Sequence, residues 1–288
     1  MRPRMSRAPR IALALLASLG AGCTRIVDLG LDDAPRQLVV EARLEAGDTR
    51  QQVLLTTTDA FSRSGPLPKA TGAVVTVTDD LGMLLPLPEI SPGRYQADTP
   101  SHHIQAGRTY TLSILWEGEQ YQATSPVVAG PTIDSLYLIF RSASLAVGDS
   151  GLRAVIDYTD PAGVENYYFW ELFVDGERVV SNDPGNQWRV ISRDRFYDGQ
   201  KVVGYLPFDE EVVLPGQFIQ LRQLAITEEA YRYYFAFYDQ ATGGGSPFST
   251  PPASVRGNVQ NLTRPEHRAL GFFLAAEARW RTLVVPQP

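Results

Sequence analysis

Hydrophobic and polar side chains alternate along much of this chain, beginning at residue 38. Apolar residues occupy every second position of Leu38–Leu44 and of Tyr110–Trp116. A period of two is the pattern of a β-strand that buries one face. We expect further strands at 53–57, 73–78, 133–140, 152–158, 167–174 and 218–226, with tight turns at 79–82 and 175–176.

One segment has the period of a helix instead. Thr227 can cap the free amides of a first turn in which Glu228 and Glu229 lie near the positive end of the helix dipole. The pattern predicts a helix near 228–240, ended by the glycines at 243–245. Four aromatic residues form one stripe along it: Tyr231, Tyr234, Phe235 and Tyr238. This spacing favours packing in the core over the alternative, a platform that stacks on a sugar or peptide.

Residues 1–22 have the features of an export signal. Four arginines and no acidic residue precede the apolar run Ile11–Ala21. That run is about half the length of roughly 20 apolar residues that a membrane-spanning helix needs. Gly20, Ala21 and Gly22 stand directly before Cys23, as in the site cut by lipoprotein signal peptidase, although a leucine is usual where Gly20 lies. We therefore expect cleavage before Cys23 and lipid on its thiol.

Cys23 is the only cysteine of the chain, so an internal disulfide is excluded. An ordinary secretory signal followed by a chance cysteine is the alternative interpretation. However, an unpaired thiol is a liability in an oxidising compartment, and lipidation explains both the number and the position of the cysteine. The two or three acyl chains of the bacterial modification would anchor the protein stably to a membrane.

The charge of the chain excludes one class of partner. The formal net charge is −6, and the mature chain carries −10 because residues 1–22 contain four arginines. An acidic body is repelled by nucleic acid and by anionic lipid. We therefore expect no nucleic-acid partner, and we expect the membrane anchor to be the lipid and not a basic patch.

Three parts follow the signal. Residues 23–36 lack periodicity and are expected to form a lipidated tether. Residues 37–130 contain short strands without a good helix, which predicts an antiparallel β-sandwich. Residues 131–288 are expected to form a second β-rich domain that carries the helix.

Few residue patterns point to chemistry. His102 and His103 are adjacent and would point to opposite faces of a strand, so a zinc site is not expected there. Asp157–Asn166 gathers oxygen-bearing side chains around a turn, which makes calcium one interpretation, although the spacing is not that of an EF-hand. The alternative is that Asp160 and Asn166 satisfy the backbone groups of the turn.

The common catalytic signatures are missing from the sequence. It has no Gly-x-Ser-x-Gly elbow, no phosphate-binding loop and no His-Glu-x-x-His motif. We expect no catalytic residue, no cofactor and no metal, and hence a protein that is not an enzyme. An extracytoplasmic hydrolase with a dispersed active site, acting on a peptide or glycan, is the alternative.

Segments spread over nearly the whole mature chain resemble one family. The matching segments are Leu38–Glu41, Val74–Asp79, Gly107–Leu112, Pro131–Leu136, Asp160–Gly163, Asn166–Tyr168, Asp194–Gln200, Thr227–Gln240 and Pro247–Asn258. In their order and spacing the chain resembles the outer-membrane lipoproteins of Bacteroidota and related bacteria that carry domain of unknown function four-two-four-nine.

The resemblance implies an immunoglobulin-like or carboxypeptidase-regulatory-like β-sandwich followed by a second β-rich domain with one prominent helix. It also implies a place in the outer membrane beside a TonB-dependent receptor, with an accessory role in nutrient uptake, and it supplies no catalytic residues. Gly163, Gly199, Gly257 and the Pro251-Pro252 pair are expected to hold turns. Arg256 is expected to be either a buried cation or a docking cation.

Overall fold

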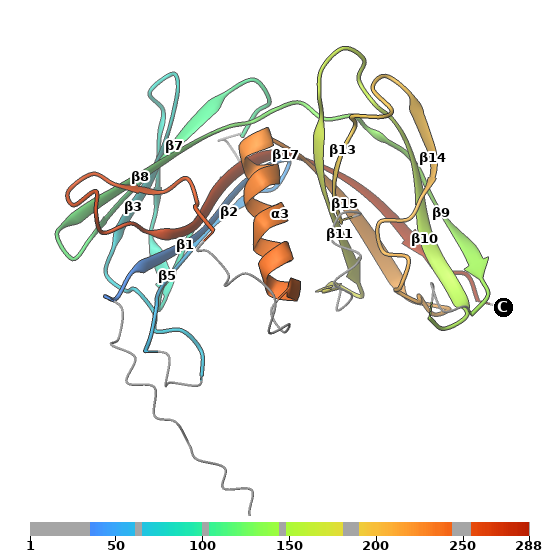
Figure 1. Cartoon of the computed structure of the whole chain (residues 1–288), viewed down its shortest axis with the longest axis horizontal. Coiled ribbons are helices and arrows are strands. Elements are labelled where there is room, and N and C mark those ends of the chain that lie inside the picture. The colour runs from blue at the N-terminus through green and yellow to red at the C-terminus, as the bar shows by residue number, and fades with distance from the viewer. Residues whose placement is uncertain are drawn as a thin grey trace, which may run out of the picture. The chain divides into compact units, whose positions relative to one another are not determined.

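Antiparallel strands make up most of the structure (Figure 1). It is a computed structural model that describes residues 35–60, 65–99, 104–143, 148–180, 190–243 and 255–287. The largest sheet contains β1 (Leu38–Ala46), β2 (Arg50–Thr57), β5 (Glu89–Ser91), β6 (Arg94–Asp98), β11 (Tyr167–Val174), β12 (Glu177–Arg178), β13 (Ile191–Arg193), β15 (Phe218–Ile226) and β17 (Leu270–Val284). Its order is β12-β11-β15-β17-β1-β2-β6-β5, and β13 pairs with β11.

Two smaller sheets complete the β-structure. One consists of β16 (Gln260–Asn261), β8 (Glu119–Pro126), β7 (Thr109–Trp116), β3 (Val74–Asp79) and β4 (Leu84–Leu87), in that order. The other consists of β14 (Lys201–Tyr205), β10 (Gly151–Thr159) and β9 (Ile133–Arg141). The expectation of a mainly β chain, compatible with sandwich packing, is confirmed.

The first hydrophobic core lies between one part of the nine-stranded sheet and the five-stranded sheet. It contains the alternating residues of β1, such as Val40 and Leu44, and those of β7, such as Leu112 and Ile114. All four side chains are completely or almost completely buried. The alternation in the sequence therefore identified the buried face of both strands.

The second core surrounds the rest of the nine-stranded sheet, with the three-stranded sheet on one face and the helix Glu228–Gly243 on the other. It contains Ile156 of β10, Trp170 of β11 and Leu221 of β15, all of them buried. The strands expected at 167–174 and 218–226 have the bounds of β11 and β15. In the predicted turn between β11 and β12, Asp175 has a φ of 52° and Gly176 a φ of 87°.

Strand β17 belongs to both cores. It pairs in parallel with β1 and antiparallel with β15. Phe273 faces the first core, whereas the neighbouring Phe272 and Leu274 face the second. Figure 1 shows this long strand running behind α3 from one group of strands to the other.

The helix α3 (Glu228–Gly243) begins where the sequence predicts. The amide of Ala230 donates a hydrogen bond to the Thr227 hydroxyl at 3.2 Å, which is the expected cap. The helix packs on the face of the nine-stranded sheet that carries Phe169 and Phe272. Among the described residues, no helix is long and apolar enough to span a bilayer.

The expected boundary at residue 130 falls in the connection between β8 and β9, where the chain passes from the first core to the second. Residues Arg36–Pro288 form one compact unit, because β17 contributes to both cores. The division into two domains stays a prediction. The signal peptide, Cys23 and all but the end of the tether lie outside the described residues.

Candidate functional site

A groove runs between α3 and the segment that leads into β16. It has a volume of about 480 Å³ and is lined by Glu228, Glu229, Arg232, Tyr233, Ala236, Gln240, Val255 and Arg256. This size is within the range of about 300–1,000 Å³ that is usual for small-molecule sites. We call it the α3 groove.

The segment that leads into β16 forms the second wall of the α3 groove, and two contacts with the backbone of β17 hold it in place. A Cβ at Gly257 would overlap the carbonyl oxygen of Gly271 on β17, so only glycine permits the close approach of the two backbones. Next to it, the side-chain amide of Asn258 bonds to the backbone of Phe273. Its Nδ2 donates to the Phe273 carbonyl at 2.8 Å, and its Oδ1 accepts from the Phe273 backbone N–H at 2.9 Å. These contacts fix Arg256 opposite the helix.

The α3 groove is lined by acidic side chains, basic side chains and one aromatic ring, that of Tyr233. Glu228 and Arg232 form an ion pair at 2.5 Å on the helix. Burial raises the pKa of the Tyr233 hydroxyl to about 12. Arg256 is exposed, and no described residue forms an ion pair with it. The α3 groove therefore offers an anionic ligand a cation beside an aromatic ring.

The aromatic stripe of α3 packs mainly as expected. Tyr231, Tyr234 and Tyr238 lie against the second core, and the Tyr234 ring is 5.1 Å from that of Phe169. Phe235 differs, because its side chain is 44% exposed and stacks on Tyr231 at the edge of the contact. The stripe is thus mainly a packing surface.

A network of charged residues lies on the same face of the nine-stranded sheet. Glu171 of β11 accepts hydrogen bonds from Arg222 and from Arg43, the latter at 2.9 Å, and forms an ion pair with Arg178 at 3.0 Å. Arg222 also pairs with Glu45. Because Glu45 is on β1 and Arg222 on β15, this pair crosses β17. We call these five residues the Arg–Glu network.

Small residues on β17 allow the Glu45–Arg222 ion pair to cross that strand. On this face of β17, Ala276 lies opposite Glu45 and Trp280 lies opposite Arg222. The methyl groups of Ala276 and of Ala278, which lies between Ala276 and Trp280, leave room above the strand. The Arg222 guanidinium also lies over the ring of Trp280, at 4.8 Å from its centroid.

The pKa values in the Arg–Glu network follow from burial and charge. Burial opposes ionisation of Glu171, but the positive charges of Arg43, Arg222 and Arg178 outweigh it and lower its pKa to about 2. For Glu45, burial is the larger effect and raises the pKa. Sequence analysis missed these residues, although charged residues within the otherwise apolar strands 167–174 and 218–226 were a signal of them.

Three aspartates meet beside the turn that the sequence identified as a calcium candidate. One carboxylate oxygen from each of Asp160, Asp194 and Asp198 lies within 4.8 Å of the others. Asp160 and Asp194 are buried, and Asp198 is exposed. Burial raises the pKa of Asp194, and the neighbouring carboxylates raise it further. We call these residues the aspartate cluster.

Each carboxylate of the aspartate cluster also accepts a backbone amide. Asp160 accepts from the amide of Gly199 at 3.0 Å and from the Tyr168 hydroxyl. Asp194 accepts from the amide of Asn166 at 2.8 Å. Asp198 accepts from the amide of Gly163 at 2.7 Å. This arrangement supports the interpretation in which Asp160 satisfies turn backbone.

The structure agrees with some of the other residue predictions, and some of those residues lie outside the part of the chain that it describes. Gly163 and Gly199 have φ values of 81° and 69°, as expected for turns. Arg256 is exposed, so of its two expected roles only that of a docking cation is consistent with the structure. The remaining predicted residues, Cys23, His102, His103 and Pro251-Pro252, lie outside the described residues.

The comparisons with known proteins give one finding. A search of curated proteins found no match to the chain. A family model described as "Domain of unknown function (DUF4249)" matches residues 24–281, which is most of the chain. This stretch begins directly after Cys23 and includes the α3 groove, the Arg–Glu network and the aspartate cluster. The chain therefore belongs to the DUF4249 family.

Proposed function

We propose that the mature protein is a lipid-anchored protein of the outer membrane that binds a ligand or partner without covalent chemistry. In this role it would serve a TonB-dependent transporter in nutrient uptake. The observation that carries the proposal is the α3 groove, in which Arg256 faces a helix wall with an aromatic ring. The export signal and the small residues before Cys23 support the anchor.

The positions of the charged residues support binding as the function. The charges of the Arg–Glu network are occupied in mutual pairing, so that network holds strands together. Arg256 has no such role in the described structure and lies at the surface. An exposed cation on a wall fixed by glycine and asparagine is suited to attracting an anionic ligand.

A lipid on Cys23 would confine the protein to one membrane surface. Such confinement raises its effective concentration near a transporter in the same membrane, so a modest affinity would be enough for a working complex. The tether at residues 23–36 would give the folded part some reach. The transporter itself enters the proposal through family resemblance.

Affinity purification tests the proposal. Tagged protein from gently solubilised membranes of the native host is expected to bring down a TonB-dependent transporter in near-stoichiometric amount. Arg256→Glu is expected to reduce the recovery, whereas Arg50→Glu, the same charge reversal on β2, is the matched control. Recovery that is equal for all three proteins would show that the α3 groove is not the docking site.

Cell fractionation tests the anchor separately. Cys23→Ser is expected to leave the signal uncut or to release the protein from the detergent-soluble membrane fraction. A variant that is processed and membrane-bound like the wild type would refute lipidation of Cys23.

A hydrolase is the second candidate, and the aspartate cluster is the observation that favours it. A carboxyl group with a raised pKa beside a second carboxylate is a common arrangement for acid–base catalysis. Against it, both oxygens of Asp160 already accept hydrogen bonds. Turnover of a peptide or glycan by the purified protein, lost in Asp194→Asn, would establish the hydrolase.

A further inference from the structure

We propose that the free edge of β9 binds an extended acidic segment of another protein by strand addition. Strand β9 is nine residues long and pairs only with β10. None of the described strands pairs with its other edge. Such an edge presents unpaired backbone N–H and C=O groups that can form a ladder with an added strand.

The other outer strands of the three sheets are all short. Their lengths are two residues in β12 and β16, three in β5 and β13, four in β4 and five in β14. In addition, β4 contains Pro86 and β14 contains Gly204 with a φ of 74°. Short strands, proline and irregular backbone are the usual means by which proteins prevent edge pairing.

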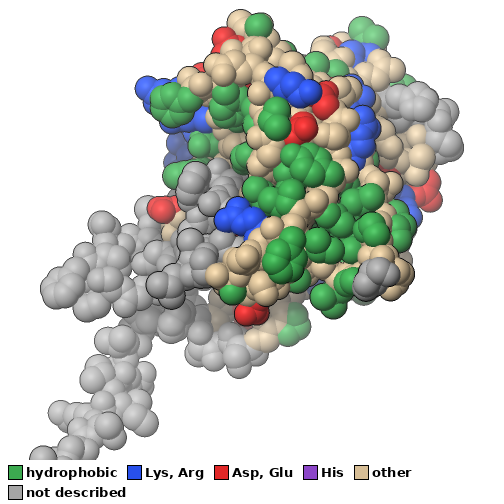
Figure 2. All heavy atoms as spheres, turned by 90° about the vertical axis from the view of Figure 1, so that its right-hand side faces the viewer, with side chains coloured by type: hydrophobic (Ala, Val, Ile, Leu, Met, Phe, Trp, Pro, Cys, Tyr) green, Lys and Arg blue, Asp and Glu red, His purple; other side chains and the backbone are tan. Residues whose placement is uncertain are grey.

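Strand β9 has none of these protections in its middle. Between Asp134 and Arg141 it runs Ser-Leu-Tyr-Leu-Ile-Phe, without charge, proline or glycine. Phe140 is 66% exposed at its end. Figure 2 looks at the side of the molecule where β9, β10 and β14 lie, and it shows hydrophobic side chains gathered there. An added strand would cover part of this surface.

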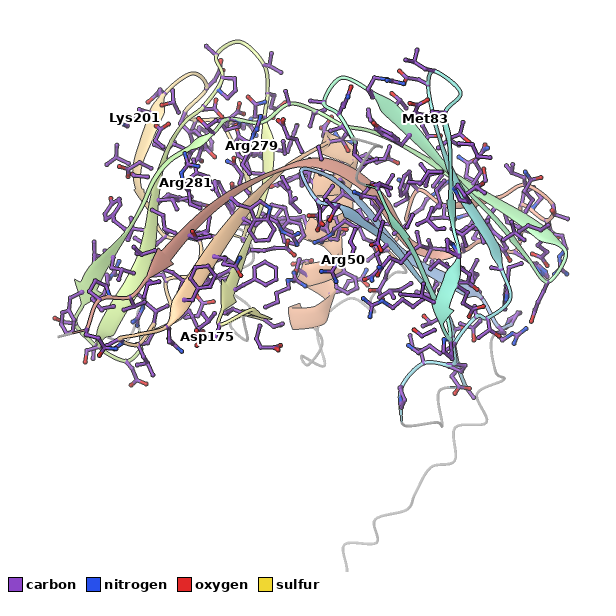
Figure 3. All side chains as sticks on the ribbon, turned by 180° about the vertical axis from the view of Figure 1, so that it is seen from behind. Arg50, Met83, Asp175, Lys201, Arg279 and Arg281 are labelled. Atoms are coloured by element: carbon purple, nitrogen blue, oxygen red, sulfur yellow. The ribbon has the colours of Figure 1, made fainter. Side chains whose placement is uncertain are left out.

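The neighbouring part of β17 determines the charge of the partner. Pairing with β1 ends at Glu277, so residues 278–284 have no described strand on that side. Strand β17 contacts β9. Figure 3 labels its two exposed cations, Arg279 and Arg281, on the strand beside the three-stranded sheet.

The register of β17 shows which face these arginines share. Arg281 is opposite Leu221, and Leu221 is opposite Leu172 of β11. Leu172 shares its face with Trp170, whose ring lies 5.2 Å from that of Tyr158 on β10, so Arg281 lies on the face that is turned towards the three-stranded sheet. Arg279 pairs with Glu277 at 2.6 Å. The Arg281 guanidinium donates to the carbonyl of its neighbour Trp280 at 3.3 Å, so its charge remains available to an anion.

These two features define the chemistry of the added strand. On the outer face its neighbours would be Tyr137 and Ile139, which favour apolar side chains. On the inner face its side chains would lie beside Leu136 and Leu138 of β9 and would approach Arg279 and Arg281 of β17, whose charges favour Asp and Glu. Because successive side chains of a strand point to opposite faces, the partner would alternate apolar and acidic residues.

A second copy of this chain fits the same edge less well. Pairing β9 with β9 across a two-fold axis would bring Arg279 and Arg281 of one copy towards those of the other. Like charges brought together oppose association. The inference does not depend on the lipid anchor, on the α3 groove or on a transporter, so it can fail or hold independently of the proposed function.

Fluorescence anisotropy with purified mature protein tests the inference. The probe is a labelled peptide, acetyl-Asp-Val-Glu-Ile-Asp-Val-Glu-Ile-amide, and the control peptide has Lys at each acidic position. We expect the acidic peptide to bind and the basic one to bind at least about fivefold more weakly, because lysines would lie near Arg281 where the acidic peptide can form an ion pair. Hydrogen exchange of residues 133–141 should slow on binding.

Two charge reversals provide the matched comparison. Arg281→Glu is expected to weaken binding of the acidic peptide by at least about fivefold. Lys201→Glu makes the same change on β14, at the opposite edge of the three-stranded sheet, and should have little effect (Figure 3). Neither side chain is part of the core, so both variants should fold.

Three outcomes would overturn the inference. One is the absence of binding of either peptide at about 1 mM, which would leave no meaningful affinity. Another is equal weakening by Arg281→Glu and Lys201→Glu, which would indicate a general charge effect. The third is a dimer in sedimentation equilibrium that the acidic peptide cannot displace, which would identify a second copy as the occupant.

Discussion

Replacing Glu171 by glutamine should destabilise the protein strongly, because this side chain is the anion shared by three arginines. Its side chain is 1% exposed, and its carboxylate contacts Arg43, Arg178 and Arg222. Glutamine keeps the size of the side chain and removes only the charge. The variant therefore leaves the buried guanidinium of Arg222, and the half-buried one of Arg43, without their main counter-ion.

Two estimates of the magnitude agree. Removing one partner of a buried ion pair typically costs about 3–5 kcal/mol. Independently, the difference between the ordinary pKa of 4.5 and the value of about 2 in the folded protein corresponds to about 3 kcal/mol, at about 1.4 kcal/mol per pH unit. We expect the free energy of unfolding to fall by about 3 kcal/mol at pH 7.

The lowered pKa of Glu171 also makes its contribution to stability depend on pH. Glu171 has a lowered pKa in the folded state, so its stabilisation is complete above pH 4.5 and is lost as the pH falls towards about 2. The difference between wild type and Glu171→Gln should therefore shrink to about 1 kcal/mol at pH 3. Glu45, whose raised pKa acts in the opposite direction, is present in both proteins and largely cancels.

Urea unfolding of the purified mature protein, followed by tryptophan fluorescence at pH 7 and pH 3, measures these differences. Glu117→Gln is the control, because Glu117 pairs with Arg36 at the surface with its side chain 53% exposed. That exposed pair should contribute no more than about 1 kcal/mol. A loss below about 1 kcal/mol for Glu171→Gln at pH 7, or one that is the same at both pH values, would refute the reasoning.

Three further changes test the other parts of the structure. Tyr234→Ala should lower the free energy of unfolding by about 3–5 kcal/mol, whereas Phe235→Ala at the exposed edge of the stripe should cost clearly less; equal effects would mean that α3 packs differently. Asn258→Ala should cost about 1–3 kcal/mol in urea unfolding, because it leaves the backbone of Phe273 without its partners, and an unchanged midpoint would contradict this role. Asp194→Asn should stabilise the protein at pH 7, because the raised pKa of Asp194 in the folded state makes its charged form unfavourable there. The gain in the free energy of unfolding should vanish below the ordinary pKa of 3.8. Destabilisation at pH 7 would instead indicate that the charge is needed, for example by a bound cation.

Sequence alone was sufficient for the elements whose signal is local. Strands such as β1 and β7 bury one face, so their apolar residues recur every two positions. The helix was visible because Thr227 caps it and its aromatic residues recur at helical spacing. The Asp175-Gly176 turn was visible because its backbone requires positive φ.

Strand β17 shows what the local pattern cannot reveal. Residues Phe272–Ala276 are buried on both faces of the sheet, so they form a continuous apolar run without alternation. Such a run does not distinguish a strand from a buried helix. Its parallel pairing with β1 joins residues about 230 positions apart, as in Ala42 opposite Phe273, and no local preference specifies that partner.

The candidate sites depend on the same kind of long-range contact. Arg256 faces α3 only because Gly257 and Asn258 dock on β17. Glu45 and Arg222 meet only because β1 and β15 lie on either side of β17. Residue type and spacing determine which segments become strands, but the order of strands in a sheet is set by packing of whole faces, and that order decides which side chains become neighbours.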